Sequence, residues 1–337
     1  MSTKLQWGVI GTGNIARAFA RGLAESQTGE LVAVGSRSNA SALAFVEDFP
    51  AACHGSYEAL LADPRVQIVY ISTPHPAHVQ WAIRAAEAGK HILCEKPLAM
   101  NLAEARSIVD AARRHGVFLM EAFMYRCHPQ IARLVELIRN RAIGDVRLIR
   151  ATFSFACPFD PKSRLLNAAL GGGGILDVGC YCASMARLVA GAACGKPFEN
   201  PIAVKGVGHI GTTGVDEYAV ASLQFPNDVL AQIASGVQLN LDNNVHIMGT
   251  EGSILLPSPW VTNNARAGFS KILVFKNHIP EEIVIETDRG IYALEADHIA
   301  EQIAQGRTQS SLVSWDDTLG NMQVLDHWRM EIDGSPY

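Results

Sequence analysis

Three residues that could take part in proton transfer are a lysine and, some eighty residues later, an aspartate and a tyrosine. Lys96 follows a short apolar run and is flanked by Glu95 and Pro97, while Asp177 and Tyr181 come after four consecutive glycines. The four-residue spacing places the aspartate and the tyrosine on one face of a helix. The pKa of a tyrosine is near 10, but a nearby ammonium stabilises the phenolate and lowers that pKa. We therefore expect Lys96 to hold Tyr181 partly ionised, with Asp177 beside them.

Each of the three residues also has a structural explanation when taken alone. Lys96 could be a solvated surface charge, Asp177 could complement the dipole at a helix N-terminus, and Tyr181 could be packed in a core. Chemistry is favoured because the three occur together with the remaining elements of a site.

The first of those elements is a glycine-rich turn at 11–16, which reads Gly-Thr-Gly-Asn-Ile-Ala. A strand precedes it and a helix follows, the context in which G-x-G-x-x-A binds a dinucleotide. Glycines let backbone amides approach a pyrophosphate, and the helix N-terminus adds partial positive charge. A turn that merely packs is the alternative. We expect dinucleotide binding here, by Gly11, Thr12, Gly13, Asn14 and Ile15.

The end of the second strand indicates which nicotinamide cofactor is used. A carboxylate there binds the ribose hydroxyls of NAD and repels the extra phosphate of NADP. This chain instead has Ser36 and Arg37, and a guanidinium makes bidentate hydrogen bonds to phosphate. The pattern favours NADP, whereas an ordinary exposed arginine at this point would leave NAD usable.

A fourth segment, 72–78, again follows a strand and leads into a helix. Thr73, Pro74, His75 and His78 are expected to line the nicotinamide side of the crevice, because ligands bind outside the carboxyl ends of parallel strands. We favour a role for His75 and His78 in capping the helix or contacting the cofactor. The alternative is that one of them acts as a catalytic acid or base. Together with His128, these histidines could form a metal site. No carboxylate accompanies them at ligand spacing, so no metal site is predicted.

The composition excludes several classes of protein. The chain has 337 residues, 48% of them hydrophobic, and a net charge of -5 without a basic block. This balance gives no electrostatic footprint for nucleic acid or an anionic membrane, so the expected partner is a small molecule. Seven scattered cysteines, the absence of a leader-like N-terminus and the lack of an apolar run approaching a membrane span predict a cytoplasmic protein.

Residues 1–122 are predicted to form an α/β domain, a Rossmann doubly wound parallel sheet. Short apolar runs alternate there with amphipathic helical stretches, as in βαβ units. The expected strands are 6–10, 31–35, 68–72, 91–94 and 117–120, and the expected helices are 14–25, 41–48, 77–88 and 102–115.

Residues 123–337 are predicted to form an α+β domain for substrate binding and oligomerisation, with a large, mainly antiparallel, open-faced sheet. The expected strands are 146–155, 203–209, 217–225, 229–236, 243–249 and 252–256. Helices are expected at 129–139, 175–188, 292–304 and 315–331, the last two able to pack back on either domain. One sheet face must be covered by another subunit, which predicts a homodimer or homotetramer. On 219–225 the two faces carry Val220, Ser222 and Gln224 on one side and Ala219, Ala221, Leu223 and Phe225 on the other.

These motifs together resemble the glucose-fructose oxidoreductase / inositol dehydrogenase / MocA (Gfo/Idh/MocA) family. The segments 121–129, 214–217 and 249–252 look most like the branch of dimeric dihydrodiol dehydrogenases and NADP-dependent D-xylose dehydrogenases. The resemblance implies that Lys96 and Tyr181 are catalytic, that Asp177 positions the substrate or the lysine, and that the bond after Lys96 is cis. It also implies that Glu95 meets the nicotinamide ribose and that Arg164 contacts the phosphate region of NADP.

The expected activity is hydride transfer between a nicotinamide and a secondary alcohol or hemiacetal of a sugar, polyol or related compound. Tyr181 would exchange a proton with the substrate oxygen, and Lys96 would polarise that oxygen. One alternative keeps the cofactor bound and recycles it, in sugar–sugar oxidoreduction or redox-assisted elimination. Another is a non-catalytic NADP-binding sensor, which has no need of Lys96, Asp177 and Tyr181 together.

Overall fold

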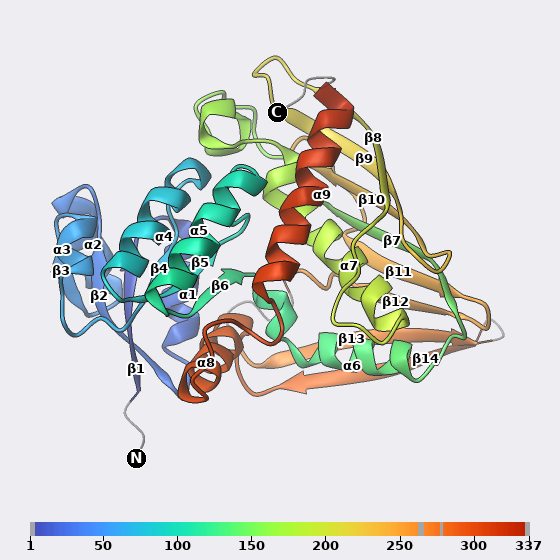
Figure 1. The fold of residues 1–337 in the computed structure, drawn as a ribbon, viewed down its shortest axis with the longest axis horizontal. Coiled ribbons are helices and arrows are strands. Elements are labelled where there is room, and N and C mark those ends of the chain that lie inside the picture. The colour runs from blue at the N-terminus through green and yellow to red at the C-terminus, as the bar shows by residue number, and fades with distance from the viewer. Residues whose placement is uncertain (1–3, 262–265, 277–278, 334–337) are drawn as a thin grey trace.

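The computed structural model describes residues 4–261, 266–276 and 279–333, which form two sheets side by side (Figure 1). The first sheet has six parallel strands in the order β3-β2-β1-β4-β5-β6. Their bounds are β1 Leu5–Ile10, β2 Gly29–Gly35, β3 Ala52–His54, β4 Ile68–Ile71, β5 His91–Glu95 and β6 Leu119–Ala122. The helices between them are α1 Asn14–Leu23, α2 Asn39–Asp48, α3 Tyr57–Leu61, α4 His78–Glu87 and α5 Leu102–His115. The doubly wound prediction is confirmed.

The strand order explains where a ligand can bind. Every residue of β4 is buried, since helices cover both faces of the sheet and the strand reads as a continuous apolar run. The chain moves outward from β1 through β2 to β3 and then returns to β4 on the other side of β1. This switch point opens a crevice beyond the carboxyl ends of β1 and β4.

The second sheet has eight strands in the order β14-β13-β12-β11-β7-β10-β9-β8. Neighbouring strands are antiparallel except β7 and β10, which are parallel. Their bounds are β7 Val146–Ser154, β8 Ala203–Ile210, β9 Asp216–Gln224, β10 Leu230–Gly236, β11 Asn244–Gly249, β12 Ser253–Pro257, β13 Gly268–Lys276 and β14 Ile279–Thr287. The mainly antiparallel α+β prediction is confirmed.

Among the described residues, three strands and one α-helix were not predicted. β3 has three residues and α3 has five, too few for a periodic pattern to show. The hairpin of β13 and β14 was missed because Pro280 and the glutamates that follow it resemble a loop; at the edge of a sheet a proline is tolerated.

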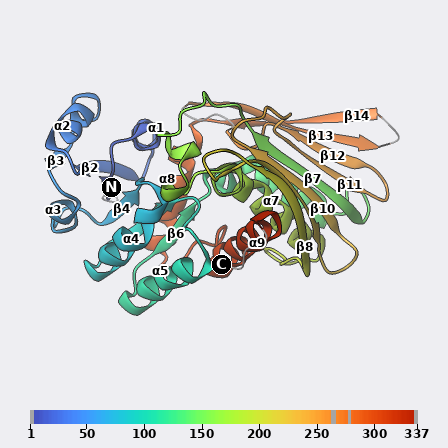
Figure 2. The same cartoon turned by 90° about the horizontal axis from the view of Figure 1, so that it is seen from above.

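Helices cover one face of the second sheet and leave the other open, as Figure 2 shows. The covering helices include α6 Pro129–Arg139, α7 Cys180–Ala193 and α9 Trp315–Asp333. Along β9 Ala219, Ala221 and Leu223 are buried while Val220, Ser222 and Gln224 are exposed, as the alternation predicts. Of the closing helices, α8 Ile291–Ala304 packs on α1, and α9 packs on α5 and β6.

Within the described residues, the segment Ala168–Ala193 is long and apolar enough to cross a membrane, contrary to the expectation that no run approaches such a span. The apolar window of this segment lies entirely inside the fold. Its helical part, the π-helical turn Ile175–Gly179 followed by α7, packs as a core helix against β7 and β10 of the second sheet, because a helix that is apolar all round is stable when it is buried on all sides.

Candidate active site

A cleft of 1110 Å³ opens at the carboxyl edge of the parallel sheet. It is bounded by the β1–α1 turn and the ends of β2, β4 and β5 on one side, and by residues of the second half of the chain on the other. Most of the predicted site residues line it together: Gly11, Thr12, Gly13, Asn14, Ile15, Ser36, Arg37, Thr73, Pro74, His75, Glu95, Lys96, Arg164 and Tyr181. Asp177 and His78 do not line it.

The glycine-rich turn has the conformation that phosphate binding needs. Gly11 has φ +102°, and a Cβ there would lie 2.8 Å from Ser72 Oγ, so the position requires glycine. A Cβ on Gly13 would meet nothing within 4 Å, which leaves room for a ligand. No side chain caps the N-terminus of α1, so its first amides are available to an anion.

The far end of the cleft carries hydroxyls and one arginine. Ser36, Arg37, Ser38, Ser41 and Tyr57 line it, and Arg37 is exposed. Among the described lining residues the charged side chains are Arg37, Lys96, Arg164 and Glu95, three cations and one carboxyl. This excess of positive charge suits an anionic ligand such as a dinucleotide.

The Thr73 hydroxyl is compatible with a polar ligand in the cleft. This hydroxyl is buried, lines the cleft and has no hydrogen-bond partner in the protein. Buried polar groups are almost always paired, so an unpaired one at a cleft wall fits a missing ligand group. The residues present are therefore compatible with a bound nicotinamide cofactor.

The two histidines of the segment 72–78 lie in different environments. His75 lies in the cleft wall, with Nδ1 3.0 Å from the carbonyl oxygen of Gly171, and burial lowers its pKa to about 3, so the imidazole is neutral. His78 is fully buried behind the wall, with its ring nitrogens 3.1 Å from Pro97 O and 2.9 Å from Thr73 O. The expectation that His78 contacts the cofactor is wrong, since its ring is enclosed by backbone.

No group of three or more His, Cys, Asp or Glu side chains comes together as metal ligands would in the part of the chain that the structure describes.

Glu95 lines the cleft and accepts a short hydrogen bond from the Tyr70 hydroxyl. Burial raises the pKa of Glu95, against the opposing effects of Lys96 and Tyr70. Contact of Glu95 with a ribose stays a prediction.

Both the backbone and the side chain of Asp177 contact the ammonium group of Lys96. Lys96 Nζ donates to the backbone oxygen of Asp177 at 2.7 Å and lies 3.5 Å from its Oδ1. Arg164 pairs with the same Oδ1 at 3.0 Å. Although burial raises the pKa of Asp177, Lys96 and Arg164 together lower it to about 2. Burial opposes the charge on Lys96, but Asp177, Cys180 and Glu95 together outweigh burial, and the ammonium pKa is raised.

The side chain of Asp177 is only 5% exposed and is not among the residues that line the cleft, and its role in positioning the lysine or the substrate stays a prediction. It lies in a π-helical turn, Ile175–Gly179, that precedes α7. Arg164 stands at this end, beside Asp177, and its contact with the NADP phosphate stays a prediction. The peptide bond between Lys96 and Pro97 is cis, as expected.

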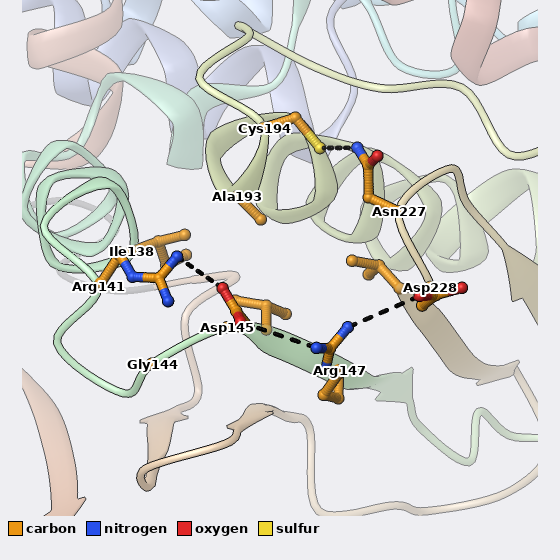
Figure 3. A pocket seen from close by; sticks show the side chains of 11 residues that line it. Ile138, Arg141, Gly144, Asp145, Arg147, Ala193, Cys194, Asn227 and Asp228 are labelled. Carbon is orange, nitrogen blue, oxygen red and sulfur yellow. Dashed lines mark hydrogen bonds and ion pairs between the residues drawn. The ribbon is translucent and has the colours of Figure 1, made fainter.

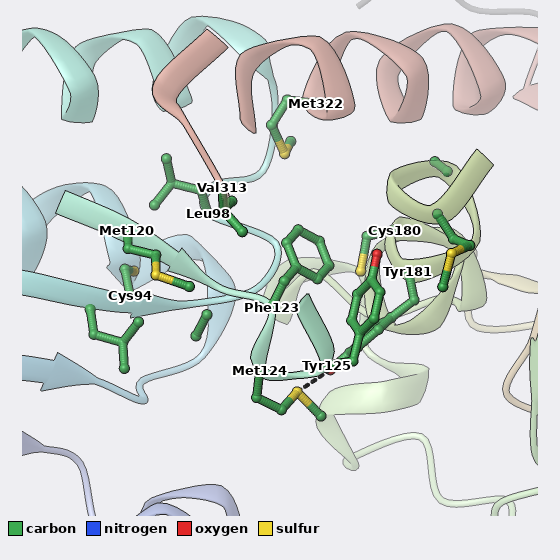
Figure 4. Close-up of a cluster of buried hydrophobic side chains, with 14 of the residues drawn as sticks. Cys94, Leu98, Met120, Phe123, Met124, Tyr125, Cys180, Tyr181, Val313 and Met322 are labelled. Atoms are coloured by element: carbon green, nitrogen blue, oxygen red, sulfur yellow. Dashed lines mark hydrogen bonds between the residues drawn. The ribbon is translucent and has the colours of Figure 1, made fainter. Parts of the chain in front are cut away.

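Tyr181 is the second residue of α7 and is packed among aromatic and sulfur-containing side chains (Figure 4). Its ring lies 5.3 Å from that of Phe123 and 5.2 Å from that of Phe153, and its hydroxyl contacts Met124 Sδ at 3.4 Å. Lys96 Nζ lies over the ring face, 5.0 Å from the centroid.

The expectation that Lys96 keeps Tyr181 partly ionised is wrong for the protein without ligands. Burial raises the pKa of Tyr181 well above 10, and the nearby Glu95 raises it further. The aromatic packing that removes water from the phenol outweighs the ammonium, which faces the ring rather than the hydroxyl. Tyr181 is thus a neutral phenol in the protein without ligands.

Ten described residues that line the cleft were not predicted as site residues: Ala18, Ser38, Ser41, Tyr57, Ser72, Met124, Ser163, Leu165, Val261 and Tyr292. Met124 and Tyr292 lie in segments singled out for other reasons, the 121–129 motif and the start of a closing helix. Tyr57 belongs to the missed helix α3, and Val261 follows β12 in an irregular segment. Apolar side chains give no sequence signal for a site, so only the fold reveals them.

A second hollow of 330 Å³ lies between α6, the end of α7 and the turn before β10 (Figure 3). Its two arginines are neutralised within the hollow: Arg141 pairs with Asp145 at 2.7 Å, and Arg147 with Asp145 and Asp228 at 3.7 and 4.0 Å. Because these charges cancel and the hollow lies away from the parallel sheet, it is a weaker site candidate than the cleft.

Comparison with known proteins places this architecture in a family. Residues 5–123 match the profile of an oxidoreductase family with an NAD-binding Rossmann fold, and residues 131–255 match the GFO/IDH/MocA C-terminal domain. The chain is 34% identical to trans-1,2-dihydrobenzene-1,2-diol dehydrogenase of Mus musculus over 97% of both chains. It is 31% identical to the enzyme of that name from Homo sapiens, again over 97% of both.

Solved structures of oxidoreductases are also similar to the chain over nearly its whole length. A 3-ketoreductase from Actinomadura kijaniata in complex with TDP-benzene and NADP matches over 98% of both chains, with a TM-score of 0.85 and 27% identity. An aldose-aldose oxidoreductase from Caulobacter crescentus complexed with glycerol matches over 98% of both, with a TM-score of 0.86 and 26% identity. The chain therefore belongs to the Gfo/Idh/MocA family of oxidoreductases, as an NAD(P)-binding dehydrogenase that acts on CH–OH groups.

Proposed function

We propose that the enzyme uses NADP(H) to interconvert a secondary alcohol or hemiacetal and its carbonyl form, on a sugar such as D-xylose, a polyol or a dihydrodiol. The observation that carries this proposal is the arrangement of Lys96 and Tyr181, which line one cleft with the glycine-rich turn and lie 5.0 Å apart, Nζ to ring centroid. The dihydrodiol dehydrogenases at 31–34% identity support this substrate range.

In the direction of carbonyl reduction, Tyr181 donates its phenolic proton to the substrate oxygen. Lys96 stabilises the negative charge that develops on that oxygen, since its ammonium has three N–H donors and Asp177 takes at most two. The nicotinamide of a bound cofactor supplies the hydride. Oxidation is the reverse, with the phenolate form of Tyr181 as base. Acid–base steps of this kind contribute about 10²- to 10⁴-fold in rate.

The high pKa of Tyr181 supports its role as an acid more directly than its role as a base. An acid that remains protonated at neutral pH gives its proton only when a stronger base, the developing alkoxide, forms beside it. The structures solved for the Actinomadura ketoreductase include variants with a substituted lysine or tyrosine, the two residue types assigned here.

NADP is proposed over NAD because the far end of the cleft offers Arg37 with flanking hydroxyls and, among its described lining residues, no carboxylate. A guanidinium pairs with a 2′-phosphate, which a ribose hydroxyl cannot match. The solved relative from Actinomadura, whose structure contains NADP, is consistent with this choice.

The test is an assay of NADPH formation with a panel of aldoses, polyols and dihydrodiols, and of NADPH consumption with the matching carbonyl compounds. Lys96→Ala should abolish most turnover and leave NADP binding nearly unchanged. Lys90→Ala is the matched control, since Lys90 also donates to two backbone oxygens, of Asp63 at 2.9 Å and Val66 at 2.7 Å, but lies outside the cleft. Wild-type turnover in Lys96→Ala would refute the assignment.

A second function, oxidoreduction between two substrates with a retained cofactor, is favoured by the similarity to the Caulobacter aldose-aldose oxidoreductase. Ultraviolet absorption of the purified protein separates the two, because a retained nicotinamide absorbs without any being added. A non-catalytic sensor is disfavoured by the buried Lys96–Asp177 pair, which nucleotide sensing does not require.

We also propose a homodimer or homotetramer formed through the open face of the second sheet, and a cytoplasmic location. That face exposes Val207, Val220, Leu230, Phe269 and Val284, each at least 47% accessible. Exposed apolar patches of this kind mark interfaces.

The proposed cytoplasmic location is consistent with the seven cysteines, which are all free, as in a reducing compartment. The division of the chain at 122/123 stays a proposal and is testable by expressing each part separately.

A further inference from the structure

Two buried side chains that do not line the cleft hold the backbone turn that carries Lys96. On one side the carboxyl of Glu121, near the end of β6, accepts a hydrogen bond from the amide of Leu98 at 2.9 Å through Oε1. On the other side His78 contacts the carbonyl oxygen of Pro97 at 3.1 Å. Glu121 is 1% exposed and His78 is fully buried.

The turn between these two contacts determines where the lysine side chain starts. Strand β5 ends at Glu95, so Lys96 is the first residue without a strand partner. Its ammonium must nevertheless reach the backbone oxygen of Asp177 at 2.7 Å. Leu98 is two residues further on, and its amide is fixed by Glu121.

We propose that Glu121 is a positioning residue for catalysis: by fixing the Leu98 amide it sets the point from which Lys96 reaches Asp177 and the substrate oxygen. The inference rests on the proposed catalytic role of Lys96. Glu121 acts as a hydrogen-bond acceptor, which a carboxyl provides whether ionised or not, so a glutamine can replace it and an apolar residue cannot.

The surroundings of Glu121 suit a holding role rather than a proton-transfer role. Thr318 and Asp317 face it from α9, Arg187 and Cys180 from α7, and Cys94 from β5. Asp317 is itself held by Arg187 at 2.6 Å and by Arg126 at 3.1 Å. The carboxyl is therefore held among buried side chains and is not among the residues that line the cleft.

The test compares Glu121→Met with Glu121→Gln, using the fastest compound of the substrate panel. Glu121→Met should lower kcat roughly 10- to 100-fold without changing the affinity for NADP, because small displacements of a catalytic group are costly. Glu121→Gln should recover kcat to within about threefold, since it restores the acceptor. Equal losses in the two variants, or an unchanged kcat in Glu121→Met, would overturn the proposal.

A double-mutant comparison separates this proposal from the proposed function. If Glu121 acts through Lys96, adding Glu121→Met to Lys96→Ala should lower kcat by less than about twofold more. A full additional loss in that background would contradict positioning even if Lys96 is catalytic. If Lys96→Ala alone keeps wild-type turnover, the proposed function itself has failed.

A readout without cofactor or substrate is the rate at which an aldehyde reagent such as pyridoxal 5′-phosphate labels Lys96, followed by peptide mass spectrometry. Release of the turn should speed labelling of Lys96 several-fold in Glu121→Met and leave Lys90 unchanged. Asp326→Leu is the matched control, because Asp326 accepts from the Leu102 amide at 2.8 Å, further along the same segment. The proposal fails if Lys96 labelling is unchanged, or if the control variant loses kcat equally.

Discussion

Replacing Glu121 by glutamine should change how the stability of the enzyme depends on pH. Burial raises the pKa of this carboxyl from 4.5 to about 7, although Thr318 and the Leu98 amide lower it in part. Between these two values the folded enzyme keeps the proton that the unfolded chain releases. The free energy of unfolding therefore falls as the pH rises from about 4.5 to 7.

The magnitude follows from the size of the shift. One pKa unit corresponds to about 1.4 kcal/mol, so this single group lowers stability by about 2 to 3 kcal/mol between pH 5 and pH 8. Glutamine does not titrate, so the variant lacks this loss. Relative to the wild type, Glu121→Gln should thus gain about 2 to 3 kcal/mol over the same interval, while the contributions of all other groups cancel.

The assay is urea unfolding of both proteins at half-unit steps from pH 5 to pH 8. Tryptophan fluorescence and circular dichroism should report the same midpoint, as a two-state transition requires. The reasoning is refuted if the difference between variant and wild type stays constant with pH, or if it shrinks as the pH rises. The first result would mean that Glu121 titrates normally, and the second that the folded enzyme stabilises its charge.

Three further outcomes are expected. Arg37→Ala should weaken NADP binding about 10-fold and leave NAD binding nearly unchanged in fluorescence titrations, since one charge-assisted contact is lost; equal effects on both cofactors would contradict the cofactor assignment. Thr73→Val should weaken NADP binding without lowering the melting temperature of the free protein, because the Thr73 hydroxyl has no protein partner. Val220→Lys should shift the mass in light scattering towards the monomer, whereas Leu43→Lys, equally exposed at 50% on α2, should not.

The parts of the fold predicted from the sequence are those whose signal is local. The alternation of apolar runs and helical stretches, and the turn at 11–16, indicated the parallel sheet and its crevice because each depends on neighbouring residues alone. β3 was too short for such a signal, and the hairpin of β13 and β14 was hidden by Pro280 and charged residues that an edge strand tolerates.

The site was predicted in its composition but not in its electrostatics. Lys96, Tyr181 and Asp177 come together as expected, yet the direction of the Tyr181 pKa shift depends on Phe123 and Phe153, which reach it from distant segments. Spacing along one helix could not show that Asp177 lies behind the lysine. Nor could it show that His78 and Glu121 contact the backbone turn that follows Lys96.

The central claim, that Tyr181 transfers the proton, is tested most directly by measuring kcat for Tyr181→Phe beside Tyr125→Phe. The two rings lie 5.7 Å apart, and the Tyr125 hydroxyl donates to Ser184 at 2.8 Å outside the cleft lining. Loss of the Tyr181 hydroxyl should lower kcat about 10²- to 10⁴-fold with NADP affinity retained, while Tyr125→Phe should keep kcat within a few-fold. Wild-type turnover in Tyr181→Phe, or an equal loss in both variants, would contradict the claim.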